Sequence, residues 1–153
     1  MRIALASDHA GFALKDHLAD SLAAAGHDVL DLGTDSTESV DYPRYAEPAA
    51  HAVAAGDADR GVLVCGSGNG VAIVANKVPG IRAVNAHDVE EAAMARRHND
   101  ANVVTLSGAR LDPGTADAIV ATFLQTDFDG GRHARRVEQI AALETTATAT
   151  ETA

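Results

Sequence analysis

One stretch of the chain decides the fold, and it reads Gly61-Val62-Leu63-Val64-Cys65-Gly66-Ser67-Gly68-Asn69-Gly70, followed by Val71-Ala72-Ile73-Val74-Ala75-Asn76-Lys77. The run of β-formers that ends at Cys65 predicts a buried strand. The glycines after it allow a tight turn, and residues 71–77 predict a helix. A strand that passes through a glycine-rich turn into a helix is typical of a parallel α/β protein.

The rest of the chain repeats this alternation of strand and helix. Apolar runs predict further strands at residues 2–7, 27–32, 81–85 and 103–107. Helical spacing and capping residues predict helices at residues 11–25, 43–55, 88–98 and 113–125, and a last one after Gly130-Gly131. We therefore expect a Rossmann-like three-layer α/β/α sandwich with a five-stranded parallel sheet, formed by one domain of residues 1–144 without internal repeats. Residues 145–153 are rich in Thr, Ala and Glu without an apolar pattern, so we expect a disordered tail.

Composition excludes several classes of protein. A formal net charge of −10 and only 3% aromatic residues argue against binding nucleic acid or an anionic membrane. A single cysteine rules out an internal disulfide and suits a reducing compartment. No stretch has the pattern of a signal peptide or the length of a membrane span. We expect a cytoplasmic protein.

The carboxyl ends of the predicted strands collect the residues that could carry chemistry. Cys65 lies there beside a helix N-terminus, where the helix dipole and free amides favour a thiolate that could act as nucleophile or base. The alternative is a buried strand cysteine that only fills space. The amides of residues 66–70 suit an anion or a developing oxyanion, although a simple tight turn explains the same glycines. A dinucleotide fingerprint would need glycine where Val71 stands, which weakens that interpretation.

Three further features admit both a functional and a structural explanation. Asp8 and His9 follow the first strand and could bind a hydroxyl or a phosphate, or could merely cap the next helix. Arg132 and Arg136 share one face of the last helix and could grip a phosphate, or could form a solvated basic face. No metal site is predicted, because the histidines outside these motifs show no common ligand spacing and one cysteine cannot build a structural zinc site.

His98 ends the helix after the fourth strand, so within its own subunit it lies at the amino edge of the sheet, away from Cys65. If His98 takes part in the same chemistry, a partner subunit must bring it there. The alternative is a helix-terminal histidine that stabilises the helix dipole.

Six motifs occur in order along the chain: residues 7–11 (Ser-Asp-His-Ala-Gly), 41–43 (Asp-Tyr-Pro), 65–70 (Cys-Gly-Ser-Gly-Asn-Gly), 75–77 (Ala-Asn-Lys), 97–100 (Arg-His-Asn-Asp) and 130–133 (Gly-Gly-Arg-His). Together they resemble the type B ribose-5-phosphate isomerases and related sugar-phosphate isomerases over about residues 2–144. The resemblance implies a homodimer, or a dimer of dimers, with an active site shared between subunits. It also implies interconversion of a phosphorylated aldose and ketose through an enediolate, without metal or cofactor.

The resemblance carries roles to individual residues. Cys65 is similar to the proton-abstracting base of the cysteine-using branch, while Val71 stands where another branch has a glutamate. Ser67 matches a hydroxyl that helps protons move, and His98 matches the acid that opens the sugar ring across the dimer. The expected binding residues are Gly66, Gly68, Asn69 and Gly70 for the enediolate, Asp8 and Asn99 for the sugar hydroxyls, and His9, Arg110, Arg132 and Arg136 for the phosphate.

The expected substrate pair is ribose 5-phosphate and ribulose 5-phosphate. Similar enzymes act on galactose, allose or four-carbon erythrulose phosphates, and the erythrulose branch also uses cysteine, so these substrates stay open. A protein of another class, a non-catalytic module that binds phosphorylated sugars at the same sheet edge, also fits these residues.

Overall fold

Strands and helices alternate along the computed structural model, which describes residues 1–151. The strands are β1 (Arg2–Ser7), β2 (Asp28–Asp31), β3 (Arg60–Cys65), β4 (Ala83–Asn85) and β5 (Val103–Ser107). The helices are α1 (Phe12–Ala24), α2 (Pro43–Ala54), α3 (Asn69–Asn76), α4 (Val89–Asn99), α5 (Pro113–Gln125) and α6 (Arg132–Glu151).

The five strands of this region form one sheet in the order β2-β1-β3-β5-β4, and every neighbouring pair is parallel. The chain leaves β1 toward β2 on one side and reaches β3 on the other. This reversal makes the carboxyl ends of β1 and β3 a topological switch point, where parallel sheets bind ligands. The register places Cys65 opposite Ser107 and Ser7 opposite Val64. Ser7, Cys65 and Ser107, the last residues of β1, β3 and β5, therefore lie at one edge of the sheet.

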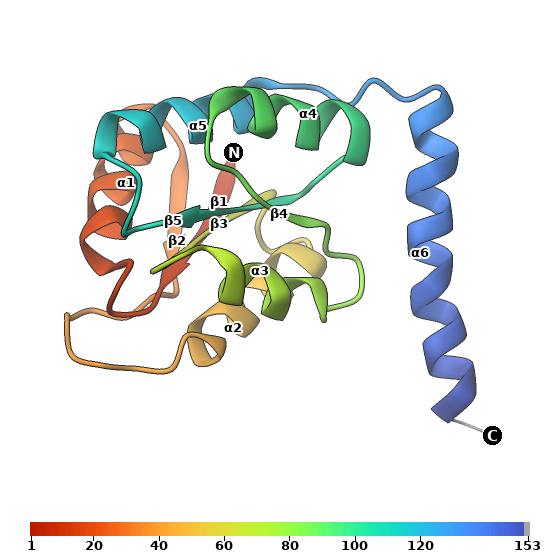
Figure 1. Cartoon of the computed structure of the whole chain (residues 1–153), viewed down its shortest axis with the longest axis horizontal. Coiled ribbons are helices and arrows are strands. Elements are labelled where there is room, and N and C mark those ends of the chain that lie inside the picture. The colour runs from red at the N-terminus through yellow and green to blue at the C-terminus, as the bar shows by residue number, and fades with distance from the viewer. Residues whose placement is uncertain (152–153) are drawn as a thin grey trace.

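Helices cover both faces of the sheet, which confirms the three-layer sandwich (Figure 1). Because side chains alternate along a strand, Ile3 and Leu5 join one core with α1, α4 and α5. Ala4 and Ala6 join the other core, with α2 and α3. Cys65 belongs to this second core, so its side chain lies on the same face as α3.

Helix starts follow the capping residues of the sequence. The Asp88 carboxylate accepts the Glu91 amide at 2.8 Å. The Glu91 carboxylate accepts the His87 amide at 2.6 Å, whereas a capping box would have it accept the Asp88 amide. Asp112 caps α5 in the same way, with Pro113 in the first turn. Helix α3 starts at Asn69, two residues earlier than expected, so Asn69 and Gly70 lie in its first turn rather than in the preceding loop.

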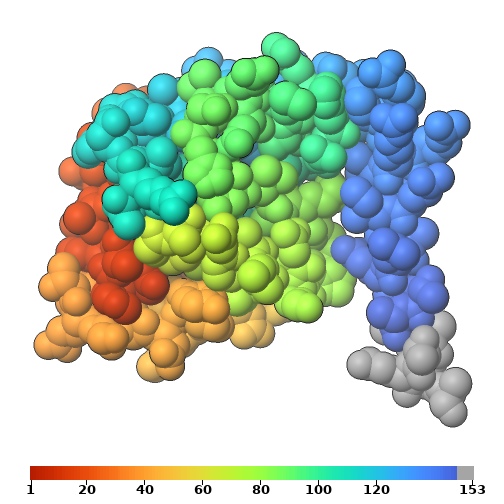
Figure 2. Space-filling model, viewed as in Figure 1, coloured from red at the N-terminus to blue at the C-terminus, as the bar shows by residue number. Residues whose placement is uncertain are grey.

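The C-terminal residues differ from expectation. Residues 145–151 continue α6 rather than forming a disordered tail, and residues 152–153 lie outside the described part of the chain. A helix already started at Arg132 elongates at little cost, and alanine favours the helix. Figure 2 shows α6 standing at one side of the body, where the Glu144 carboxylate accepts the Gly80 amide at 2.9 Å. Within residues 1–151, no helix combines the length and the apolar character needed to cross a bilayer.

Candidate active site

Cys65 ends β3 and is 4% exposed. The Gly68 amide donates a hydrogen bond to its sulfur over 3.2 Å. Gly68 can turn its amide back toward the sulfur because its backbone is left-handed, with φ of +81°, which glycine adopts without a steric penalty. An amide donor aimed at sulfur stabilises negative charge there, so the turn suits a reactive thiolate.

The glycine turn, residues 66–70, is held by its carbonyl groups. The Thr105 hydroxyl donates to the Gly68 carbonyl over 2.8 Å, and the Ser107 hydroxyl donates to the Gly66 carbonyl over 2.6 Å. Among residues 1–151, the amides of Ser67 and Gly70 have no hydrogen-bond acceptor. A turn with fixed carbonyls and available amides can receive a developing oxyanion without reorganising.

Asn85 supports the same turn, a role that sequence reasoning did not give it. Its side-chain amide donates to the Ser67 carbonyl over 3.1 Å and to the Asn69 side-chain oxygen over 2.8 Å. It packs so closely that a Cβ added at Gly68 would lie 2.3 Å from its Oδ1. The available signal was its place at the carboxyl end of β4, next to strand β5.

Ser67 is exposed, and its hydroxyl oxygen accepts the Asn69 amide over 3.1 Å. This bond uses the oxygen and leaves the hydroxyl hydrogen for a ligand. Tyr42, at the start of α2, lies across the turn, because a Cβ added at Gly70 would be 2.6 Å from its Cζ. Tyr42 belongs to the Asp-Tyr-Pro motif of residues 41–43, and the sequence alone indicates no role for it.

Asp8 and His9 lie at the same carboxyl edge, directly after β1. The buried Asp8 carboxylate accepts the Gly11 amide over 3.1 Å through one of its two oxygens. That oxygen supports the start of α1, as the structural explanation expects. Nδ1 of His9 lies 3.1 Å from the amide nitrogen and 3.2 Å from the carbonyl oxygen of Val40, so the backbone of Val40 holds the ring on that side. Arg110 is exposed in the turn after β5, at this edge as well.

The other expected site residues lie at the opposite edge of the sheet. His98 and Asn99 end α4, and Arg132 and Arg136 start α6. Helix α4 runs antiparallel to the strands, so its C-terminus reaches their amino ends, where α6 packs against it (Figure 1). One chain therefore holds two groups of site residues, and only the first contains Cys65.

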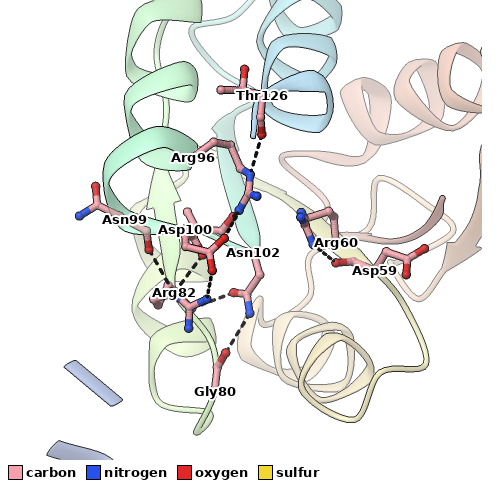
Figure 3. Close-up of polar contacts among 10 residues, drawn as sticks. Asp59, Arg60, Gly80, Arg82, Arg96, Asn99, Asp100, Asn102 and Thr126 are labelled. Carbon is pink, nitrogen blue, oxygen red and sulfur yellow. Dashed lines mark hydrogen bonds and ion pairs between the residues drawn. The ribbon is translucent and has the colours of Figure 1, made fainter. Parts of the chain in front are cut away.

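An ion-pair network holds the end of α4. The Asp100 carboxylate contacts Arg96 at 2.9 Å and Arg82 at 3.3 Å. Nε of Arg82 also donates to the Asn99 carbonyl over 3.1 Å, while Figure 3 shows the Asn99 side chain directed away from the network. The backbone of the last turn is thereby fixed, and the side chain of Asn99 is available to a ligand.

His98 and His133 stack face to face, with ring centroids 4.4 Å apart and planes 9° from parallel. Their nitrogens and the Asp129 carboxylate lie within 4.8 Å of one another. A bound cation needs lone pairs that converge, whereas parallel rings direct their in-plane lone pairs side by side. The exposed guanidinium groups of Arg132 and Arg136 add positive charge to this end of α6. The geometry favours a stacked pair over a cation site.

These features define a parallel α/β protein with a cysteine beside a glycine turn that has available amides, at the switch point of its sheet. Residues 3–140 match the model of the Ribose/Galactose Isomerase family. The ribose-5-phosphate isomerase B of Escherichia coli (strain K12) is 44% identical over 143 residues, covering 94% of this chain and 96% of that protein. The D-erythrulose-4-phosphate isomerase of Pectobacterium atrosepticum is 41% identical over 145 residues, covering 94% and 95%.

Solved structures agree with this assignment. The ribose-5-phosphate isomerase B of Clostridium thermocellum superposes with a TM-score of 0.95 at 46% identity, covering 96% of this chain and 99% of that one. The type B ribose 5-phosphate isomerase of Trypanosoma brucei gives 0.89 at 46% identity, covering 93% and 97%. The chain belongs to the Ribose/Galactose Isomerase family, and it is an isomerase.

Proposed function

We propose that this isomerase interconverts ribose 5-phosphate and ribulose 5-phosphate through an enediolate, with Cys65 as the base. The observation that carries the proposal is the hydrogen bond from the Gly68 amide to the Cys65 sulfur, over 3.2 Å. It couples a proton acceptor to a turn that can also bind the oxyanion, and both are needed to remove a hydrogen next to a carbonyl.

The reaction starts from the open-chain aldose. The Cys65 thiolate takes the proton from C2, the C–H electrons form the C1–C2 double bond, and the carbonyl electrons move to O1. The amides of Ser67 and Gly70 stabilise that oxygen. The Ser67 hydroxyl passes a proton from O2 to O1, and the Cys65 thiol returns its proton to C1, which gives the ketose. These steps need neither a metal nor a cofactor.

Completion of the site requires a second copy of the chain, because the second group of residues lies at the opposite edge of the sheet. In the homodimer, His98 of one subunit protonates the ring oxygen of the sugar bound beside Cys65 of the other. Asp8 and Asn99 contact hydroxyls. His9 and Arg110 meet Arg132 and Arg136 around the phosphate, and their positive charges orient the reacting carbons.

The same machinery suits a four-carbon substrate, D-erythrulose 4-phosphate. The D-erythrulose-4-phosphate isomerase is 41% identical to this chain, and the Escherichia coli ribose-5-phosphate isomerase B is 44% identical, so sequence identity does not separate the two substrates. Six-carbon allose or galactose 6-phosphates form a third option. Sugar length is set by the loop between β2 and α2, which places Tyr42 against the turn.

Proton NMR in D₂O tests the reaction and its substrate together. The enzyme is mixed with ribose 5-phosphate and, in parallel, with D-erythrulose 4-phosphate. Deuterium should enter the carbon next to the carbonyl while aldose and ketose interconvert, faster with ribose 5-phosphate. Faster conversion of the four-carbon sugar would select the alternative substrate, and exchange with neither would refute both.

Substitution of Cys65 separates an enzyme from a non-catalytic sugar-phosphate-binding module. Cys65→Ala should lower kcat by roughly 10²–10⁴-fold, the usual contribution of a general base, while inorganic phosphate still binds. Turnover that survives the substitution would refute the assignment of the base. Mixing Cys65→Ala with His98→Ala under subunit exchange should restore activity, since one of the two sites in the hybrid dimer is intact. No rescue despite confirmed exchange would refute the shared site.

A further inference from the structure

His133 has no role in the reaction described above, yet it lies against the residue that opens the sugar ring. Its imidazole stacks on that of His98 at 4.4 Å, 9° from parallel. Both side chains are half-buried, in contrast to the exposed Arg132 and Arg136 beside them. His98 ends a helix, and a side chain in such a position needs a neighbour to restrict its rotamers.

The connection between α5 and α6 is built to place His133. Gly130 and Gly131 both have positive φ, +66° and +55°, a turn that side-chain-bearing residues disfavour. The Asp129 amide donates to the Arg97 carbonyl over 3.1 Å, which ties this turn to α4 one residue before His98. The His133 amide donates to the Gly130 carbonyl over 3.0 Å, which closes the turn at the start of α6, and α6 packs against α4.

The charges around His98 and His133 favour different roles for the two rings. Partial burial lowers the pKa of His133, and the positive charges of His98, Arg132 and Arg136 lower it further, while the Asp129 carboxylate opposes them. Two protonated rings at this distance repel each other. A neutral His133 can stack on His98 without competing for the proton that His98 delivers.

We propose that His133 is a positioning residue, whose ring, stacked on that of His98, holds it in the orientation needed to protonate the ring oxygen of the sugar. This inference rests on the proposed function of His98. It also gives a reason for the two glycines before α6, since a turn without them would move His133 away from α4.

The chemistry of the two sugars provides the test. Ribose 5-phosphate closes a furanose ring and must be opened before isomerisation. Ribulose 5-phosphate cannot close one, because its O5 carries the phosphate, so its C1 proton exchanges without ring opening. The experiment compares conversion of ribose 5-phosphate with deuterium exchange at C1 of ribulose 5-phosphate, for the wild type, His133→Ala, His133→Phe and the control Arg135→Ala.

We expect His133→Ala to lower kcat for ribose 5-phosphate roughly 10-fold or more, as loss of orientation of a general acid does, while exchange into ribulose 5-phosphate stays within about twofold. His133→Phe keeps a flat ring and should recover most of the conversion. Arg135→Ala, on the same turn of α6, should change neither assay.

Equal losses in both assays would show a merely structural role and overturn the inference, as would full conversion by His133→Ala. Conversion that is lost with a chelator and restored by Zn²⁺ would also overturn it, in favour of a cation held by the two histidines and Asp129. If the wild type exchanges no deuterium into ribulose 5-phosphate, the proposed function itself fails. A failure of the proposed function therefore shows in the wild type, whereas a failure of this inference shows only in the activities of the His133 variants.

Discussion

Substitution of Gly68 by alanine tests whether the turn beside Cys65 is as tightly built as its geometry indicates. Two costs add at this position. The left-handed backbone, with φ of +81°, costs a side-chain-bearing residue about 1–2 kcal/mol. The new Cβ would also lie 2.3 Å from Oδ1 of Asn85 and 2.9 Å from the carbonyl carbon of Leu106, which adds about 1–3 kcal/mol of overpacking.

Gly56 provides a matched control. Its φ is +80°, but no atom lies within 4 Å of an added Cβ, so Gly56→Ala carries only the backbone cost. In urea unfolding at one fixed protein concentration, Gly56→Ala should lower the free energy of unfolding by about 1–2 kcal/mol and Gly68→Ala by about 2–5 kcal/mol. Only Gly68→Ala should also lower kcat, because relieving the clash moves the amide that faces Cys65. Equal destabilisation by the two variants, with activity retained in both, would refute the close contact between Gly68 and Asn85.

Further predictions concern stability and its dependence on pH. Thr105→Val removes the buried hydroxyl that donates to the Gly68 carbonyl, and it should lower the free energy of unfolding in urea by about 1–3 kcal/mol. An unchanged free energy of unfolding would contradict a stabilising role for this hydrogen bond. Lys15 is 2% exposed and pairs with the 39% exposed Asp31 at 2.6 Å. Asp31→Asn leaves this buried cation only the exposed Asp16 carboxylate at 3.7 Å, so it should destabilise more than Lys15→Met; the reverse order would refute the argument. Hydrogen bonds from the amide and then the hydroxyl of Thr115 lower the pKa of Asp112, so its contribution is present above about pH 4 and is lost as the pH falls through the lowered pKa. The free energy of unfolding of Asp112→Asn should therefore approach that of the wild type below pH 4, and a constant difference between pH 7 and pH 3 would argue against this linkage.

Local patterns accounted for most of the elements. The helix starts at Pro43 and Pro113 and the strand that ends at Cys65 agree with the sequence to the residue, because caps, prolines and apolar runs act over a few neighbouring positions. The disordered tail was the main error. A polar segment without an apolar face predicts disorder, whereas α6 continues through residues 145–151 by helix propagation.

The candidate site was predicted in part. Asp8, Cys65 and the glycine turn were expected at one edge because the carboxyl ends of parallel strands meet there. His98 was expected at the other edge from the direction of its helix, and the structure places it there. Asn85 and Tyr42 were not given roles, since nothing local to either residue indicates that it packs on the turn.

The sequence by itself determined the order of strands and helices, because each element depends on contacts within a few residues along the chain. It also determined the parallel sandwich and the chemical types at the strand ends, because strands that alternate with helices pair in parallel and collect their carboxyl ends at one edge. Only the tertiary structure decided the strand order and the partners of the turn, which Ser107 reaches across 41 residues and Thr105 across 37. It also decided the stack of His98 on His133. Such contacts form when whole elements dock, and the packing of helices on the sheet sets their distances rather than the spacing of residues in the sequence.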